Sequence, residues 1–147
     1  MTSPDLTQRP PRSPRVRLGG YAILARLLDK GRATLAGKQG EYKYACPLDE
    51  RFLEFAGIDG DALEQQLASG KGDGEILDWI NFQAKHKHTA AEIEAWSACQ
   101  ERRAPDDPDS REYFKGLHKK AGPNRTDINS WFDLLDLDDF ASFGGKV

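Results

Sequence analysis

The segment RPPRSPRVRLGGYAILARLLDKGRATLAG, residues 9–37, decides the fold because it holds the clearest apolar helical pattern in the chain. Apolar or small residues recur there at steps of three and four, which places them on one face of a helix. They are Leu24, Leu27, Leu28, Gly31 and Leu35. The pattern predicts a helix over residues 18–35, with Gly37 as the residue that ends it.

Residues 1–17 precede this helix and differ from it in composition. They contain four of the eight prolines in the chain and have no helical periodicity. Proline fixes φ and biases the preceding residue toward extended backbone. We therefore expect an extended Pro/Arg-rich arm over residues 1–17 and a single compact helical domain over residues 18–147. Val16 and Leu18 lead directly into the apolar run, which suggests that the end of the arm is docked.

Apolar stripes and helix-capping residues indicate six further helices after Gly37. Thr89, with Glu92 three residues later, forms the clearest capping box. The expected helices begin near Pro47, Asp61, Asp73, Thr89, Asp109 and Asp127. Residues 41–44 alternate polar and aromatic side chains, which is a weak strand signal. The sequence therefore predicts an all-α fold of about seven short helices, or a mainly α fold with one short β-hairpin.

The composition narrows the class of protein. The chain has 147 residues, of which 38% are hydrophobic and 31% are charged. No stretch approaches the roughly 20 apolar residues that a membrane helix needs, and the N-terminus has no apolar signal-peptide region. The two cysteines form no CxxC motif, which argues against a disulfide framework and a cysteine-based zinc site. We expect a cytoplasmic protein that does not bind a membrane.

The charge is distributed unevenly along the chain. Residues 1–45 contain nine Lys or Arg and three Asp or Glu, although the net charge of the whole chain is -3. The basic part could therefore bind an external anion, or it could pack against the acidic remainder of the same chain. The sequence alone leaves both alternatives open.

The best candidate binding site is the basic segment itself. If a helix starts at Leu18-Gly19-Gly20, its first N–H groups point outward and the glycines let a ligand approach the backbone. Such a helix start binds anions, and arginines add forked donors for carboxylate or phosphate. The predicted anion site comprises Arg12, Arg15, Arg17, Gly19, Gly20, Tyr21, Arg26, Asp29, Lys30 and Arg32.

Other chemistry-bearing residues give weaker signals. His86 and His88 project about 200° apart on a helix and cannot share a metal there, so we predict no metal site and no cofactor. Cys46 has no histidine near it in sequence, and we expect it to pack beside Tyr44 as a structural residue. The glycine-rich loops lack nucleotide-binding patterns. No nucleic-acid recognition motif is present, so nucleic acid is an unlikely partner.

The order of motifs in the first half of the chain resembles the bacterial family called domain of unknown function 5069. The motifs are Asp5-Leu6, Pro11-Arg12-Ser13, Leu18-Gly19-Gly20, Arg26, Asp29-Lys30, Arg32-Ala33, Gly40-Glu41-Tyr42, Cys46 to Asp49 and Leu53-Glu54-Phe55. The second half matches only loosely. The resemblance implies a bacterial protein with one domain, and it implies no activity.

These observations lead to a functional hypothesis without a named reaction. We expect a non-catalytic binding or interaction module, with a small anionic ligand or another protein chain as partner. The alternative is a small enzyme acting on a phosphorylated or carboxylate substrate, with Tyr21, Asp29 or Glu41 as acid/base candidates. A third alternative is a structural subunit that uses residues 131–143 as a contact face. The sequence does not indicate the oligomeric state.

Overall fold

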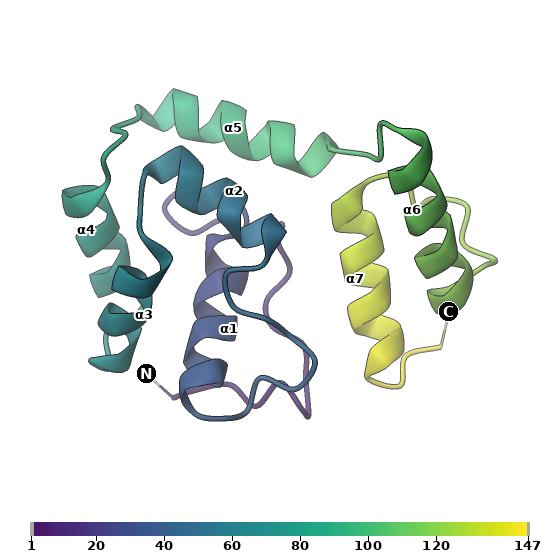
Figure 1. Ribbon diagram of the computed structural model, residues 1–147, viewed down its shortest axis with the longest axis horizontal. Coiled ribbons are helices and arrows are strands. Elements are labelled where there is room, and N and C mark those ends of the chain that lie inside the picture. Colours follow the sequence, from purple (N-terminus) through teal and green to yellow (C-terminus); the bar gives the residue numbers. More distant parts are fainter. Residues whose placement is uncertain (1, 147) are drawn as a thin grey trace.

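Seven helices account for all regular secondary structure in residues 2–146, which the computed structural model describes (Figure 1). They are α1 Leu24–Leu35, α2 Pro47–Ala56, α3 Gly60–Ala68, α4 Asp73–Gln83, α5 Ala90–Arg102, α6 Pro108–Ala121 and α7 Trp131–Ser142. The described residues form no strand; the nearest feature is an isolated bridge between Leu18 and Tyr21. The all-α prediction is confirmed, and residues 41–44 do not form the short hairpin that it allowed.

Helix α1 lies in the middle of the molecule. Helices α3 and α4 flank it on one side, and α6 and α7 run in the same direction side by side on the other (Figure 1). Helices α2 and α5 cross one end of α1, and α5 connects the two sides. Most of α1 is buried, including its charged residues Arg26, Lys30 and Arg32. Charged side chains on α1 are therefore forced to find partners inside the protein.

The predicted start of the first helix is wrong, because α1 begins at Leu24 and not at Leu18. Residues 18–21 form a tight turn in which Leu18 and Tyr21 each donate a backbone hydrogen bond to the other. Gly19 and Gly20 both have positive φ, at 58° and 85°, which is incompatible with a right-handed helix. Tyr21, Ala22 and Ile23 precede the helix and are nevertheless buried in the core.

Residues 2–17 form no helix or strand and lie against the body of the protein. Leu6 is only 1% exposed, and its backbone N–H donates to the carbonyl oxygen of Lys38. Pro14 is also buried, and its carbonyl oxygen accepts a hydrogen bond from the backbone of Ile23. The expected docking of the end of the arm is confirmed, and it extends back to Leu6.

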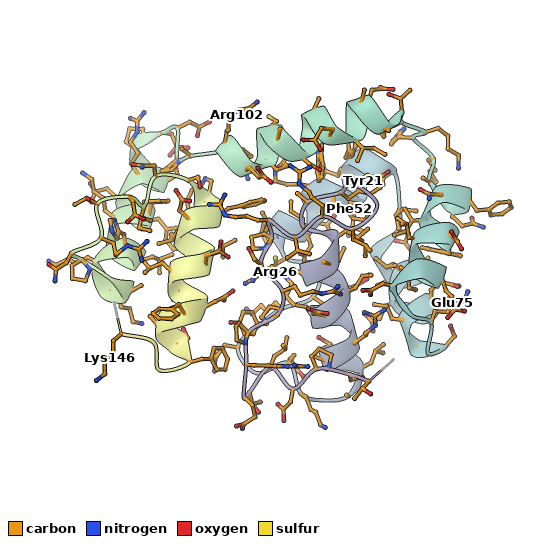
Figure 2. The ribbon with its side chains drawn as sticks, turned by 180° about the vertical axis from the view of Figure 1, so that it is seen from behind. Tyr21, Arg26, Phe52, Glu75, Arg102 and Lys146 are labelled. Carbon is orange, nitrogen blue, oxygen red and sulfur yellow. The ribbon has the colours of Figure 1, made fainter. Side chains whose placement is uncertain are left out.

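Two apolar clusters make up the core. The larger cluster surrounds α1 and contains Tyr21 and Phe52, which meet edge to face with ring centroids 5.1 Å apart (Figure 2). The smaller cluster joins α6 to α7 through Phe114, Ile128, Leu134 and Leu137. The α6–α7 pair therefore has a core of its own, and Phe132 is the α7 side chain buried in the larger cluster.

Several helix boundaries follow the capping residues expected from the sequence. The Thr89–Glu92 capping box at α5 is confirmed by hydrogen bonds in both directions. The last helix begins four residues later than expected. Ser130 caps it, with its side chain accepting from the backbone of Asp133, so Asp127 lies in the preceding loop. The start of α7 is therefore set by the N-cap Ser130 and not by Asp127.

We predict that Gly19→Ala destabilises the protein by about 2 kcal/mol or more. An alanine would adopt an unfavourable positive φ, and its Cβ would lie 2.4 Å from Leu77. Gly116→Ala in α6 is the control, because nothing lies near its Cβ and alanine favours a helix by up to about 1 kcal/mol. Urea unfolding of both variants measures the difference. Equal stabilities would contradict the assigned turn.

Candidate functional site

The cations of the predicted anion site pair with carboxylates of the same chain. Arg12 donates to Asp29 and Asp73, Arg15 to Asp133 and Asp136, and Arg17 to Glu94 and Glu101. Arg26 pairs with Asp139, Lys30 with Asp49, and Arg32 with Asp73. The acids belong to α1, α2, α4, α5 and α7. Of the two alternatives left open by the charge distribution, these pairs correspond to packing against the acidic remainder.

The predicted site residues therefore do not converge on one point. Arg12, Asp29 and Arg32 share a network around Asp73, whereas Arg15 and Arg17 reach different helices. Gly19 and Gly20 form no helix start, and an added Cβ at Gly19 would already clash with Leu77. The helix start that was expected to hold an anion therefore does not lie at this turn, because α1 begins at Leu24.

Two of the three acid/base candidates are held by other contacts. Tyr21 is 3% exposed within the larger core cluster, and burial raises the pKa of its hydroxyl. Asp29 accepts hydrogen bonds from the backbone and side chain of Arg12. Glu41 alone among the three lines the cleft described below.

The Asp73 network is the clearest electrostatic link between the arm and the helices. Arg12 Nη1 lies 2.8 Å and Arg32 Nη1 lies 2.7 Å from its carboxylate oxygens. Burial alone would raise the pKa of Asp73, but the hydrogen bonds from both arginines outweigh it and lower the pKa. Asp73 is the first residue of α4, so the network ties the arm and α1 to that helix.

A cleft of about 910 Å³ lies between the α1–α2 side of the molecule and the α6–α7 pair. Arg26, Lys30, Tyr42, Cys46 and Leu48 line one wall, and Tyr113, Trp131, Leu135, Asp138 and Phe143 line the other. Figure 1 shows α7 facing α1 and α2 across this space. The lining mixes apolar rings with charged groups, which is the composition of many small-molecule sites.

One wall of the cleft is held by a buried ion pair between α1 and α7. Arg26 Nη1 lies 2.7 Å from Asp139 Oδ2, and both side chains are at least nine-tenths buried. The Tyr42 hydroxyl donates to the other oxygen of Asp139 at 2.7 Å, and the Arg26 guanidinium lies 5.4 Å from the centre of the Tyr42 ring. Burial lowers the pKa of Arg26, but its contacts with Asp139 reverse that effect and raise it.

A second buried group lies beside the cleft. Lys30 Nζ is 2.7 Å from Asp49 Oδ2 and 3.3 Å from the sulfur of Cys46. The backbone N–H of Cys46 donates to the same carboxylate, so all three side chains are held together at the start of α2. Cys46 is half-buried and lines the cleft. The sulfur of Cys46 therefore contacts the ammonium group of Lys30, and its expected packing beside Tyr44 stays a prediction.

Arg51 and Arg103 line the same cleft and differ from Arg12, Arg15 and Arg17 of the arm. Among residues 2–146, neither forms an ion pair with a carboxylate. Arg51 Nε donates to the buried amide oxygen of Gln100 at 2.7 Å. Burial and the charge of Arg51 lower the pKa of Arg103. Two like charges are thus held close together at a concave surface.

Sequence reasoning did not identify these two arginines. Arg51 lies on the polar side of an amphipathic helix, and Arg103 follows a helix that ends in several charged residues. Neither position has a local pattern that distinguishes it from a solvated surface charge. Only the packing of α2 against the end of α5 brings them together, so no signal in the sequence could have found the pair.

The cleft changes character along its length. The backbone N–H of Trp131 donates to the carbonyl oxygen of Arg103, so the arginines lie at the N-terminal end of α7. Asp138 lies seven residues further along α7, which corresponds to about 10 Å. Burial and the neighbouring Asp139 raise the pKa of Asp138. We call the end formed by Arg51, Arg103, Tyr113 and Trp131 the basic end of the cleft.

A family model, described as a domain of unknown function (DUF5069), matches residues 8–141 of the chain. The chain belongs to the DUF5069 family. The match covers most of the arm and nearly all of the seven helices, so the resemblance is not limited to the first half of the chain. The DUF5069 region includes all four residues of the basic end. No curated protein is similar enough to the chain to match it.

Other expectations can be compared directly with the described residues. His88 stacks on Phe55, with ring centroids 3.8 Å apart, and its Nε2 lies 2.8 Å from the Phe55 carbonyl oxygen. Within residues 2–146, no group of three or more His, Cys, Asp or Glu is arranged to hold a metal ion. None of the described helices combines the length and apolar character needed to cross a membrane.

We predict that Asp73→Asn lowers the free energy of unfolding at pH 7 by about 1–3 kcal/mol, because two arginines lose a charged acceptor. The pKa of Asp73 is lower in the folded protein than its ordinary value of 3.8, so folding favours the charged form. This stabilisation is complete above pH 3.8 and is lost as the pH falls through the folded pKa. The difference in the free energy of unfolding between the wild type and the variant should therefore become smaller at acidic pH.

Urea unfolding at several pH values between 7 and 2 measures this gap. Asp78→Asn is the control, because Asp78 is an exposed acid of the same helix with no ion pair among the described residues. It should change the stability little at pH 7. A constant gap between the wild type and Asp73→Asn at all pH values would show that the carboxylate charge is not the source of the stabilisation.

Proposed function

We propose that the protein is a non-catalytic binding module for a small anionic ligand, and that the ligand binds in the cleft between the α1–α2 side and the α6–α7 pair. The volume of about 910 Å³ is in the range of known small-molecule sites. The proposal retains the ligand class expected from the sequence and moves the site from the arm to the cleft, where Arg26 and Lys30 of α1 contribute to the lining.

The observation that carries the proposal is the contrast between two sets of arginines. Arg12, Arg15 and Arg17 of the arm each have a carboxylate partner, whereas Arg51 and Arg103, which line the cleft, have none among the described residues. Holding two like charges together costs free energy unless an anion neutralises them. The forked N–H groups of arginine suit a planar carboxylate or a phosphate. An oxyanion at the basic end would relieve the repulsion and gain charge-assisted hydrogen bonds.

The enzyme alternative has less support from the cleft. Tyr21 lies in the core and Asp29 is bound by Arg12, so two of its three acid/base candidates are unavailable to a ligand there. Glu41 lines the cleft but has no hydrogen-bonded partner among the described residues that would orient it. A catalytic role therefore stays a prediction without a positioned acid or base.

We predict that inorganic phosphate raises the melting temperature of the wild type by roughly 3–6 °C at a concentration about ten times its dissociation constant. Sodium chloride of equal ionic strength provides the baseline. Arg103→Ala should abolish the rise, because it removes one of the two guanidinium groups that bind the anion. The rise should persist in Arg102→Ala, because Arg102 lies at the outer side of the C-terminal end of α5 (Figure 2).

Stability without phosphate separates a binding role from a structural one. Arg103→Ala should leave the melting temperature unchanged or raise it, because the substitution removes repulsion from Arg51. An arginine that stabilised the fold would give a lower value. No phosphate-specific rise in the wild type, or an equal rise in Arg103→Ala and Arg102→Ala, would refute the proposal.

A further inference from the structure

The basic end of the cleft contains aromatic surface that the fold itself leaves uncovered. Tyr113 is 64% exposed although it is a large ring, and it lines the cleft beside Trp131. The two ring centroids are 6.5 Å apart and the rings are inclined by 42°, so they do not stack on each other. Phe114 meets Trp131 edge to face, at 5.3 Å and 73°.

Aromatic rings elsewhere in the protein are arranged differently. Phe55 stacks on Trp96 at 4.7 Å and on His88 at 3.8 Å, with interplanar angles of 7° and 5°. Both faces of the Phe55 ring are therefore occupied by other rings. Neither Tyr113 nor Trp131 has a stacked partner among the described residues. Exposed aromatic rings in a concave site are suited to stacking against a flat apolar group.

The arginines and the rings are close enough for one small molecule to contact both. The backbone N–H of Trp131 donates to the carbonyl oxygen of Arg103 at 2.9 Å, so these two residues are joined directly. Arg51 donates to Gln100, which lies in α5 three residues before Arg103. Tyr113 and Trp131 are adjacent across the α6–α7 pair. Cationic donors and flat apolar surface therefore meet at the same end of the cleft.

We infer that the ligand is an aromatic oxyanion, a molecule that carries a carboxylate or phosphate group close to a planar aromatic ring. Arg51 and Arg103 bind the oxyanion, and Tyr113 and Trp131 bind the ring. This inference rests on the proposed function and adds the chemical class of the ligand. The aromatic contact is worth about 0.5–1.5 kcal/mol beyond apolar burial, which corresponds to a roughly 2- to 13-fold preference for an aromatic ring.

Phenyl phosphate and cyclohexyl phosphate form the matched pair of probes. They carry the same anion on rings of similar size, and only phenyl phosphate has a planar π surface. Titration calorimetry of the wild type should give a dissociation constant for phenyl phosphate about 2- to 13-fold lower than that for cyclohexyl phosphate. Equal dissociation constants would overturn the inference.

Tyr113→Leu should remove much of this preference while the protein stays folded, because the ring is mostly exposed and leucine favours a helix. Phe82→Leu is the control, because Phe82 is an 80% exposed ring on α4 that does not line the cleft. It should retain the full preference. An unchanged preference in Tyr113→Leu, or the same loss in both variants, would contradict the assignment of the ring site.

The outcomes separate this inference from the proposed function. Phosphate binding that depends on Arg103 but shows no preference between the two phosphate esters would overturn the ligand class alone. Failure of inorganic phosphate and both esters to bind would overturn both proposals. A preference for phenyl phosphate that survives in Arg103→Ala would mean that the ring binds without the anion contact, and it would also overturn the inferred ligand class.

Discussion

The pairing of the N-terminal cations with acids of distant helices is the constraint on which the rest of the structure depends. Arg26 and Lys30 are almost completely buried on α1, and a buried charge is tolerated only with a charged or strongly hydrogen-bonded partner. Their acids, Asp139 and Asp49, lie on α7 and α2. The position of α1 relative to both helices is therefore restricted by charge as well as by apolar packing.

The same pairing explains the uneven charge of the sequence. A basic first third and an acidic remainder look like a binding surface when they are considered separately. In the folded chain they neutralise each other, with Arg15, Arg17 and Arg26 reaching acids 77 or more residues away along the chain. The charge that remains without a partner is then informative. Of the arginines that line the cleft, Arg26 is paired with Asp139, whereas Arg51 and Arg103 have no carboxylate partner among the described residues.

The sequence predicted the helical class and several helix boundaries because those depend on local chemistry. The Thr89–Glu92 box and the proline at the start of α2 act through neighbouring residues. The start of α1 could not be predicted in the same way. The apolar run continues back to Leu18, but the turn at Gly19 and Gly20 is stabilised by packing against Leu77 and Ile93 of other helices. Tertiary contacts there override the periodicity.

The candidate site was harder to predict than the fold for a related reason. Seven of the ten residues singled out from the sequence are charged, and of these Arg26 and Lys30 line the cleft. Their partners, however, are separated from them by 19–113 residues, and a pattern in one segment cannot reveal whether such a partner exists. The basic end of the cleft combines residues of α2, the α5–α6 connection, α6 and α7. No local pattern joins these segments.

The arrangement of the core suggests how the cleft persists instead of collapsing. The α6–α7 pair has its own apolar cluster, and it is attached to the larger core through Phe132 and through the ion pairs of Arg15 and Arg26. Directional polar contacts fix a separation, whereas continuous apolar packing would draw the two sides together. The Arg26–Asp139 pair with Tyr42 thus acts as a spacer along the cleft. On this argument, the ion pairs that neutralise the arm also preserve the space in which the unpaired arginines can receive a ligand.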